Sequence, residues 1–171
     1  MVSPEFRNFK CRVPGIPVAP NKRALKYYNL DKMGEIKVKI RLENARDLIF
    51  KEENRLGKQK VRSADIEAVV DTGAVMMLLP QDLVENLGLE MAGKTIVTLA
   101  DETKRELDVA KRVAVTIAGR QWETDCLVGP PACEPLIGQL ILERLDLILD
   151  PLKRTVTPRP ESPYLPTLKL K

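Results

Sequence analysis

The chain contains no histidine among its 171 residues. Histidine is the base in Ser-His-Asp and Cys-His catalysis and the commonest ligand of catalytic zinc. Its absence excludes those nucleophilic enzymes and most catalytic zinc sites. Acid–base chemistry near neutral or acidic pH must therefore come chiefly from carboxylates. We expect neither a metal ion nor another cofactor.

Cysteine is also scarce. The three cysteines, Cys11, Cys126 and Cys133, form no C-x-x-C pair. Cys126 and Cys133 are too far apart in the sequence for a zinc knuckle. We therefore expect reduced thiols that have no role in a metal site or a disulfide framework.

Long apolar runs are missing. No segment approaches the roughly 20 apolar residues that a membrane helix requires, and residues 1–10 lack the apolar core of a signal peptide. We therefore expect no membrane association and predict a cytoplasmic protein. Hydrophobic residues make up 44% of the chain and charged residues 30%, which is ordinary for a soluble globular domain. The length suffices for one well-packed domain.

The net charge of +4 is unevenly distributed. Residues 1–32 hold seven basic and two acidic side chains, so the rest of the chain is close to neutral. We predict that 1–32 form a basic N-terminal extension. Such an arm can bind nucleic acid or an acidic surface. Solvated tails of this kind usually have no such partner, so we do not expect nucleic-acid binding, although the arm leaves it open.

The first half of the domain is dominated by strand patterns. Apolar and charged side chains alternate over residues 33–42, which predicts a half-buried strand. A charge-rich connection over residues 44–62 has room for a short helix. Three more elements follow: a strand over Ser63–Val70, a short buried strand over Val75–Leu79, and a helix over Gln81–Leu87. Pro80 and Gly88 mark the two ends of this helix.

The second half continues with hairpins. The elements that we expect are strands over Lys94–Ala100 and Arg105–Val109 joined by the tip 101–104, strands over Arg112–Ile117 and Gln121–Val128, a helical turn or two over Gln139–Leu145, and strands over Leu147–Leu149 and Thr155–Thr157. This pattern predicts a mainly β domain over residues 33–159. Residues 160–171 form a proline-rich tail.

The tetrad Asp71-Thr72-Gly73-Ala74 follows the apolar run Ile66–Val70. A glycine permits a tight turn after the strand and lets a substrate approach the backbone closely. The Thr72 hydroxyl can donate and accept hydrogen bonds. An ionised carboxylate at the end of a buried strand is costly to desolvate, which suggests that Asp71 has a use.

One carboxylate alone is a poor catalyst of amide hydrolysis. Water attack needs a base for the water and an acid for the carbonyl or the leaving amine. Two carboxylates that share one proton provide both functions, because like charges about 3 Å apart cannot both ionise.

The second carboxylate is the open question, because the tetrad occurs only once. None of the other candidate aspartates precedes Thr-Gly or Ser-Gly: Asp65, Asp82, Asp101, Asp108, Asp125, Asp146 and Asp150. A two-fold homodimer is the most economical source, since it doubles any residue close to its axis.

With these motifs the chain resembles the retropepsin-like (retroviral-type, single-domain) aspartic proteases over residues 33–159. Asp71-Thr72-Gly73-Ala74 resembles the catalytic loop of that family. The second glycine element, Leu136, Ile137 and Gly138, resembles the apolar pair and glycine that precede its C-terminal helix. The hairpin Thr98–Glu106 lies between them, where the family has its flap.

The resemblance implies a fold, an assembly and a set of roles. The fold would be a closed acid-protease-like barrel with a flap hairpin and one or two short helices, acting as a two-fold homodimer on a peptide or protein substrate. Asp71 of each subunit would activate the lytic water, Thr72 would bond across the interface, and Gly73 would contact the substrate backbone. The flap tip, formed by Ala100, Asp101, Glu102 and Thr103, would close over the peptide.

Two features depart from the family pattern. Many retroviral members have an acidic residue two places after the first glycine and an arginine after the second glycine. This chain has Val75 and Gln139 there, so both charges of that pair are absent together. The flap tip is charged, whereas viral enzymes have a glycine-rich one.

Three other interpretations compete with a protease. Asp, Thr and Gly are common in turns at strand ends, so the tripeptide alone could be structural. Actin-like ATPases use an Asp-x-Gly-Thr or Asp-x-Gly-Ser turn for phosphate, but Ala74 lacks the hydroxyl and the chain is too short for that duplicated fold. The third is a dimer of the same fold with little or no turnover, which would act as a peptide- or protein-binding module.

Overall fold

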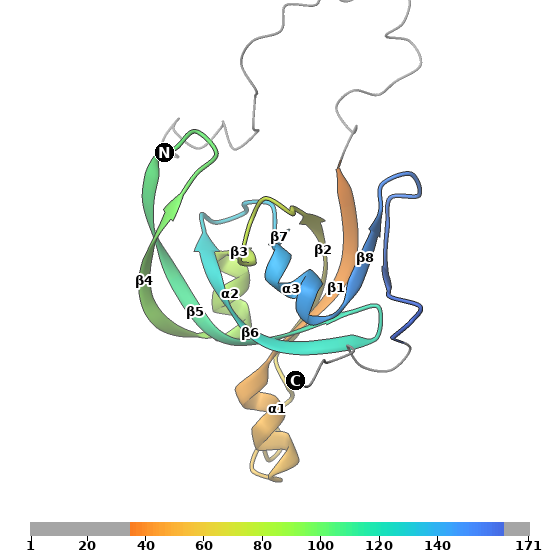
Figure 1. Ribbon diagram of the computed structural model, residues 1–171. Coiled ribbons are helices and arrows are strands. Elements are labelled where there is room, and N and C mark those ends of the chain that lie inside the picture. Colours follow the sequence, from red (N-terminus) through yellow and green to blue (C-terminus); the bar gives the residue numbers. More distant parts are fainter. Residues whose placement is uncertain (1–34, 163–171) are drawn as a thin grey trace, which may run out of the picture.

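A computed structural model describes residues 35–162 (Figure 1). The predicted extension over residues 1–32 and most of the predicted tail lie outside these residues. The elements in chain order are β1 Ile36–Asn44, α1 Ala45–Glu52, β2 Ser63–Val70, β3 Leu78–Pro80, α2 Gln81–Leu87, β4 Glu90–Thr98, β5 Lys104–Ile117, β6 Arg120–Gly129, β7 Leu136–Ile137, α3 Gln139–Arg144, β8 Leu147–Asp150 and β9 Thr155–Pro158.

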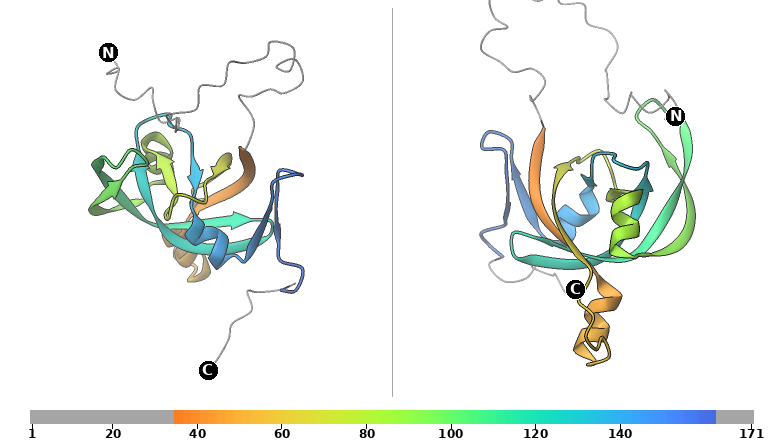
Figure 2. Two further views of the ribbon diagram at one scale, coloured as in Figure 1. Left: turned by 45° about the horizontal axis from the view of Figure 1, so that its top comes forward. Right: turned by 180° about the vertical axis from the view of Figure 1, so that it is seen from behind.

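The protein is mainly β and has a single domain, as predicted. Seven strands form one sheet in the order β1-β2-β7-β3-β6-β5-β4, and β5 pairs again with β1. Strands β8 and β9 form a separate two-stranded sheet. Figure 2 shows that the strands curve strongly and that α1 projects away from the body of the molecule. The three short helices of the described part exceed the one or two that we expected.

Local sequence signals set several boundaries correctly. Strand β2 and helix α2 have the predicted bounds. Pro80 is the N-cap of α2, and Gly88 follows the helix in the left-handed conformation with φ 58°. Glycine adopts this conformation without the steric cost of a Cβ. Helix α1 lies in the predicted connection, where the Asn44 side chain accepts hydrogen bonds from the backbone of Arg46 and Asp47.

Two predictions about strands were wrong. The strand expected over Val75–Leu79 is reduced to β3, and Val75 is 69% exposed because the chain there forms a surface loop. The segments expected as separate strands around residues 105–117 are one long strand, β5. A β-bulge between Ala110 and Val113 bends it, and Arg112 takes a φ of 61° there. The bulge interrupts the alternation that the sequence pattern relies on.

The core lies inside the curve of the sheet and against α2 and α3. Its largest fully buried side chains come from strands, helices and loops far apart in the sequence: Leu42, Met77, Leu79, Leu87, Ile117, Ile137, Ile141 and Leu145. Met77 is 1% exposed and fills the core. Non-local packing therefore fixes the positions of the short strands β3 and β7, whose two or three residues provide little pairing of their own.

Candidate active site

The two glycine elements lie side by side. Strand β7 pairs with β2 in parallel, with Val70 opposite Ile137, and with β3 in the antiparallel sense. The Asp71 backbone N–H donates to the carbonyl oxygen of Ile137 at 3.0 Å. The fold thus brings together the two motifs that the sequence separates by more than sixty residues.

The loop after β2 is held by its own aspartate. The Gly73 N–H donates to Asp71 Oδ1 at 2.8 Å, and the Ala74 N–H donates to the Asp71 carbonyl oxygen at 3.3 Å. A Cβ at Gly73 would lie 3.1 Å from Asp71 Oδ1, so glycine keeps room for this turn. One carboxylate oxygen of Asp71 is therefore used inside the loop.

Helix α3 fixes the far side of the same loop. The backbone N–H groups of Gln139 and Leu140 donate to the carbonyl oxygens of Ala74 and Val75 at 2.7 and 3.1 Å. These helix N-terminal donors would otherwise be unsatisfied. A Cβ at Gly138 would lie 2.6 Å from the carbonyl oxygens of Val75 and Met76. Gly138 is thus the residue that allows α3 to approach the loop this closely.

Asp71, Thr72 and Gly73 are all exposed. The sequence predicted an Asp71 carboxylate at the end of a buried strand, shielded from water. In the single chain this carboxylate is exposed instead, because β2 is only partly buried where it ends. Among the described residues, the Thr72 side chain has no hydrogen-bond partner. Two apolar side chains beside the loop are also exposed, Val75 at 69% and Leu140 at 39%.

The flap hairpin has the predicted position between β4 and β5. Its tip closes through hydrogen bonds from the Leu99 N–H to the Thr103 carbonyl oxygen and from the Glu102 N–H to the Leu99 carbonyl oxygen. The Asp101 carboxylate accepts from the Thr103 hydroxyl at 2.6 Å and from the Thr103 N–H at 3.0 Å. These bonds to Thr103 hold the pKa of Asp101 below its usual range.

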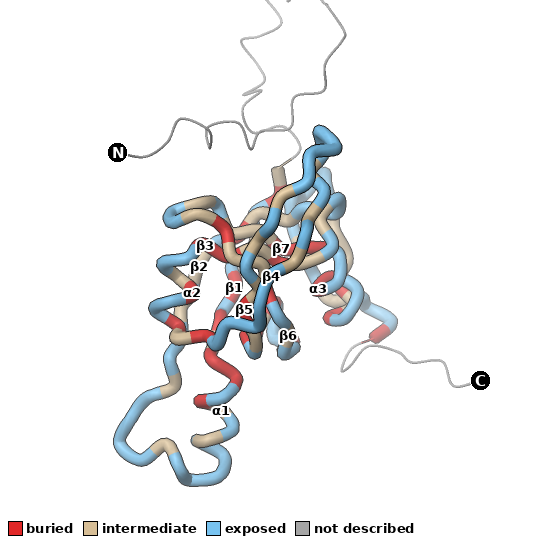
Figure 3. Tube along the Cα trace, turned by 90° about the vertical axis from the view of Figure 1, so that its left-hand side faces the viewer, coloured by how far each residue is buried: buried red, intermediate tan, exposed pale blue. Residues whose placement is uncertain are grey.

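The two faces of the flap hairpin differ in exposure. Val97, Arg105 and Leu107 are partly shielded, whereas the intervening Lys104 and Glu106 are exposed. Val97 and Arg105 are directly opposite each other across the hairpin. Figure 3 shows the exposed tip, and Figure 1 shows that it rises at the end of the molecule where β2 ends. The shielded face is therefore the one turned toward the body.

The two cysteines within the described residues take no part in this arrangement. Cys126 and Cys133 are free thiols, while Cys11 lies outside the described residues. Burial raises the pKa of Cys126 to about 12, so this thiol stays protonated at neutral pH. Within residues 35–162, no group of three or more Cys, Asp or Glu side chains is placed to hold a metal ion.

Sequence reasoning located the Asp71 tetrad and the Gly138 element but missed the exposed pair Val75 and Leu140. The sequence predicted a buried strand position for Val75 and a helical position for Leu140, and it did not indicate that either side chain is exposed. No pattern in the sequence distinguishes them, because their exposure follows from how the loop and α3 pack together.

The mainly β fold, the Asp-Thr-Gly loop and the flap hairpin are together those of a retroviral-type aspartyl protease domain. The family model described as "gag-polyprotein putative aspartyl protease" matches residues 58–144, and the chain belongs to this family. The match includes the Asp71 loop, the flap hairpin and Gly138. The comparison with curated proteins gave no match. Among the described residues, no helix is long and apolar enough to cross a membrane.

Proposed function

We propose that the protein is a homodimeric aspartic endopeptidase in which Asp71 of two subunits forms one catalytic dyad. The proposal rests on the exposure of the Asp71 carboxylate in the single chain and on the rigidity of its loop. Its carboxylate is exposed, while backbone hydrogen bonds to Ile137, Gln139 and Leu140 hold its loop. A fixed and accessible carboxylate suits a residue that completes a site with a second copy of itself.

The proposed chemistry follows from two such carboxylates in contact. One Asp71 is ionised and takes a proton from the water as its oxygen attacks the peptide carbonyl carbon. The other is protonated and donates to the carbonyl oxygen, which gives a tetrahedral diol. The C–N bond then breaks as the Asp71 that took the water proton donates it to the leaving nitrogen, while the other Asp71 takes a proton from a diol hydroxyl, so the dyad again holds one shared proton.

The surface around the loop supports this dimer. The unpartnered Thr72 hydroxyl can bond to the second copy of the loop, and the exposed Val75 and Leu140 offer apolar area beside it. Gly73 would contact the substrate backbone, and Ala74 would support the loop. Since Val75 and Gln139 replace the charged pair of many viral members, this dimer would depend on apolar contact there.

We also propose a closed barrel, the bounds of the protease domain, and roles for the second glycine element and the flap tip. Pairing of β5 with β1 links the two sides of the sheet, which supports a closed barrel. The protease domain would span residues 33–159, flanked by the basic extension and the proline-rich tail. Leu136, Ile137 and Gly138 would support the catalytic loop. The tip residues Ala100, Asp101, Glu102 and Thr103 would cover an extended peptide substrate. A cytoplasmic location remains a prediction.

Mass spectrometry of the incubated full chain and of a peptide library tests this proposal. We expect products across part of the range pH 3 to 8, with the highest rate on the acid side of neutral and no effect of EDTA. Asp71→Asn should give none, while Asp108→Asn, on the exposed face of β5, should cleave normally. Cleavage by Asp71→Asn at the wild-type rate would refute the role of Asp71. A dimer that binds peptides without any cleavage would instead support the binding-module alternative.

A further inference from the structure

A second site lies where α1 meets the sheet, and we propose that it binds a phosphate group of a nucleotide or of single-stranded nucleic acid. A cavity of about 340 Å³ opens between α1, the segment that leads into β2, and the bulge of β5. This volume is in the range of small-ligand sites. The charged side chains that line it are Arg46, Asp47, Arg62, Glu90, Lys111 and Arg112.

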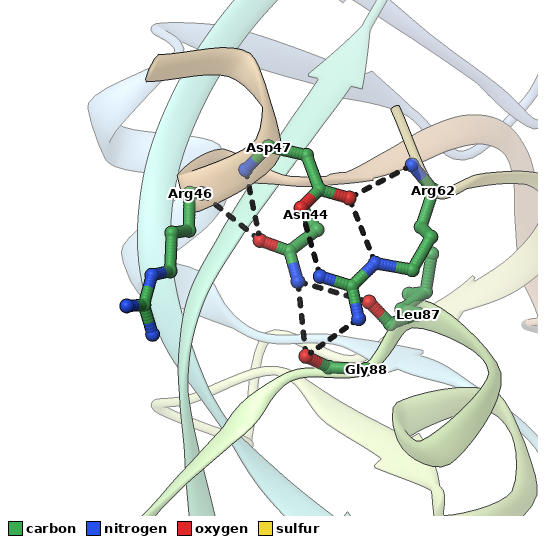
Figure 4. A network of polar contacts seen from close by, with 6 residues as sticks. All are labelled: Asn44, Arg46, Asp47, Arg62, Leu87 and Gly88. Carbon is green, nitrogen blue, oxygen red and sulfur yellow. Dashed lines mark hydrogen bonds and ion pairs between the residues drawn. The ribbon is translucent and has the colours of Figure 1, made fainter. Parts of the chain in front are cut away.

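Most of the negative charge in this lining is already used. Asp47 accepts three hydrogen bonds from Arg62, from its backbone N–H at 3.1 Å and from its guanidinium at 2.7 and 2.8 Å (Figure 4). This pairing holds the pKa of Asp47 below its usual range. The Glu90 side chain is 61% exposed, and its Oε2 atom lies 3.8 Å from Nη1 of Arg46. The carboxylates therefore neutralise Arg62 and weaken the charge of Arg46.

Lys111 and Arg112 provide the positive charge that is not used. Neither side chain makes an ion pair within residues 35–162, although each lines the cavity. They are adjacent in the sequence, and both line the cavity at the bulge between Ala110 and Val113. The φ of 61° at Arg112 is unusual for a residue other than glycine or asparagine.

The chemistry favours phosphate over a carboxylate. A phosphate monoester carries more than one negative charge, and each phosphodiester of a single strand carries one. Both have several acceptor oxygens, which suit the Lys111 ammonium and Arg112 guanidinium that line the same cavity. Arg46 also lines the cavity and can supply a third contact if it leaves Glu90, since it takes no part in the Asp47–Arg62 pair (Figure 4). Gln59 adds an amide donor to the lining.

This site is separate from the Asp71 loop and does not depend on the proposed function. The α1 end of β2 begins at Ser63, and Asp71 follows the other end of the strand. Eight residue steps at ~3.3 Å each place Ser63 and Asp71 roughly 26 Å apart along the strand. A ligand bound at α1 would therefore leave the Asp71 loop open.

Binding measurements on the full chain test the site. The probes are pyrophosphate, AMP and a labelled single-stranded 12-mer RNA at low salt. We expect K111Q/R112Q to weaken binding of at least one of these probes about tenfold or more. The matched control, K39Q/K104Q, removes the same charge from exposed positions on β1 and β5 and should bind as the wild type does. Thermal melts verify that both variants fold.

The outcomes are distinct. If AMP or pyrophosphate binding is lost in K111Q/R112Q, the ligand is a small phosphate compound. If only RNA binding weakens, the ligand is a nucleic acid. The proposal is overturned if the wild type binds none of the probes. Equal binding by both double variants would also overturn it and would assign any RNA affinity to the basic extension, residues 1–32.

Discussion

Gly138 lies against the carbonyl oxygen of Met76 so closely that a Cβ at residue 138 would be 2.6 Å from it. The same position would be 2.6 Å from the carbonyl oxygen of Val75. Backbone atoms cannot move aside as a flexible side chain can. Helix α3 can therefore pack against the Asp71 loop only when residue 138 has no side chain. We expect any side chain at this residue to displace the loop.

We expect Gly138→Ala to destabilise the protein by about 1–3 kcal/mol, as over-packing commonly does, and to abolish cleavage even where the variant still folds. Urea denaturation and peptide cleavage measure the two effects. The control is Gly119→Ala, which has open space around its Cβ but a φ of 81°. That variant should lose stability through backbone strain and keep its specific activity. Normal cleavage by folded Gly138→Ala would contradict this coupling.

The proposed dyad of two Asp71 carboxylates makes a quantitative prediction for mixed dimers. If wild type and Asp71→Asn chains are equilibrated in equal amounts, only about a quarter of the dimers contain two Asp71 carboxylates, because subunits pair at random. Activity per total protein should fall to about a quarter of the wild-type value. A fall to one half would indicate that each subunit works alone.

The sequence predicted the elements whose signals are local. Helix α2 has the expected bounds because Pro80 and Gly88 act within one turn of its ends. The flap hairpin was found because its strands alternate and its tip is polar. The strand expected over Val75–Leu79 was wrong because the apolar character of Val75 does not determine whether its side chain is buried in the core or exposed at the surface.

The non-local relationships could not be predicted from the residues alone. Parallel pairing of β2 with the two-residue strand β7 depends on the packing of Ile137 in the core. The bend in β5 depends on the bulge at Arg112, which in the sequence looks like a gap between two strands. The family resemblance identified Leu136, Ile137 and Gly138 as the second glycine element, but only the structure shows that Gly138 lies against the Asp71 loop and gives the steric reason.

Asp47 should make stability depend on pH. Its folded-state pKa is lowered, first by the side-chain hydrogen bond to Arg62, so its stabilising contribution is present above the unfolded pKa of about 4. That contribution is lost as the pH falls through the lower, folded-state pKa. We expect Asp47→Asn to cost about 1–2 kcal/mol at pH 7, since Asp47 is buried but Arg62 is half exposed.

Urea denaturation of wild type and Asp47→Asn from pH 7 down to pH 3 measures this difference. The difference in free energy of unfolding between the wild type and Asp47→Asn should become smaller below about pH 4. Asp65→Asn is the matched control, because Asp65 is 74% exposed and pairs with Arg41 at 3.3 Å on the surface. It should change stability by less than about 0.5 kcal/mol. A constant gap for Asp47→Asn across the range would refute the ionic role.

The shielded face of the flap hairpin should influence which peptides are cleaved. Arg105 is the charged residue on this face between Val97 and Leu107, and part of its charge acts on Asp101 at the tip. When the flap covers a peptide, water is excluded and a substrate carboxylate near Arg105 gains a stronger interaction than in solvent. We expect the protein to prefer peptide substrates that have an acidic side chain at the residue lying next to Arg105 when the flap covers the peptide.

Arg105→Glu should therefore reduce kcat/KM for acidic members of a peptide library about tenfold relative to basic members. Lys104→Glu makes the same charge change on the exposed face and should leave that ratio unchanged. Both variants are compared by mass spectrometry at one pH and one ionic strength. If Lys104→Glu shifts the ratio as much as Arg105→Glu does, the preference comes from the overall charge of the flap hairpin and not from its inner face.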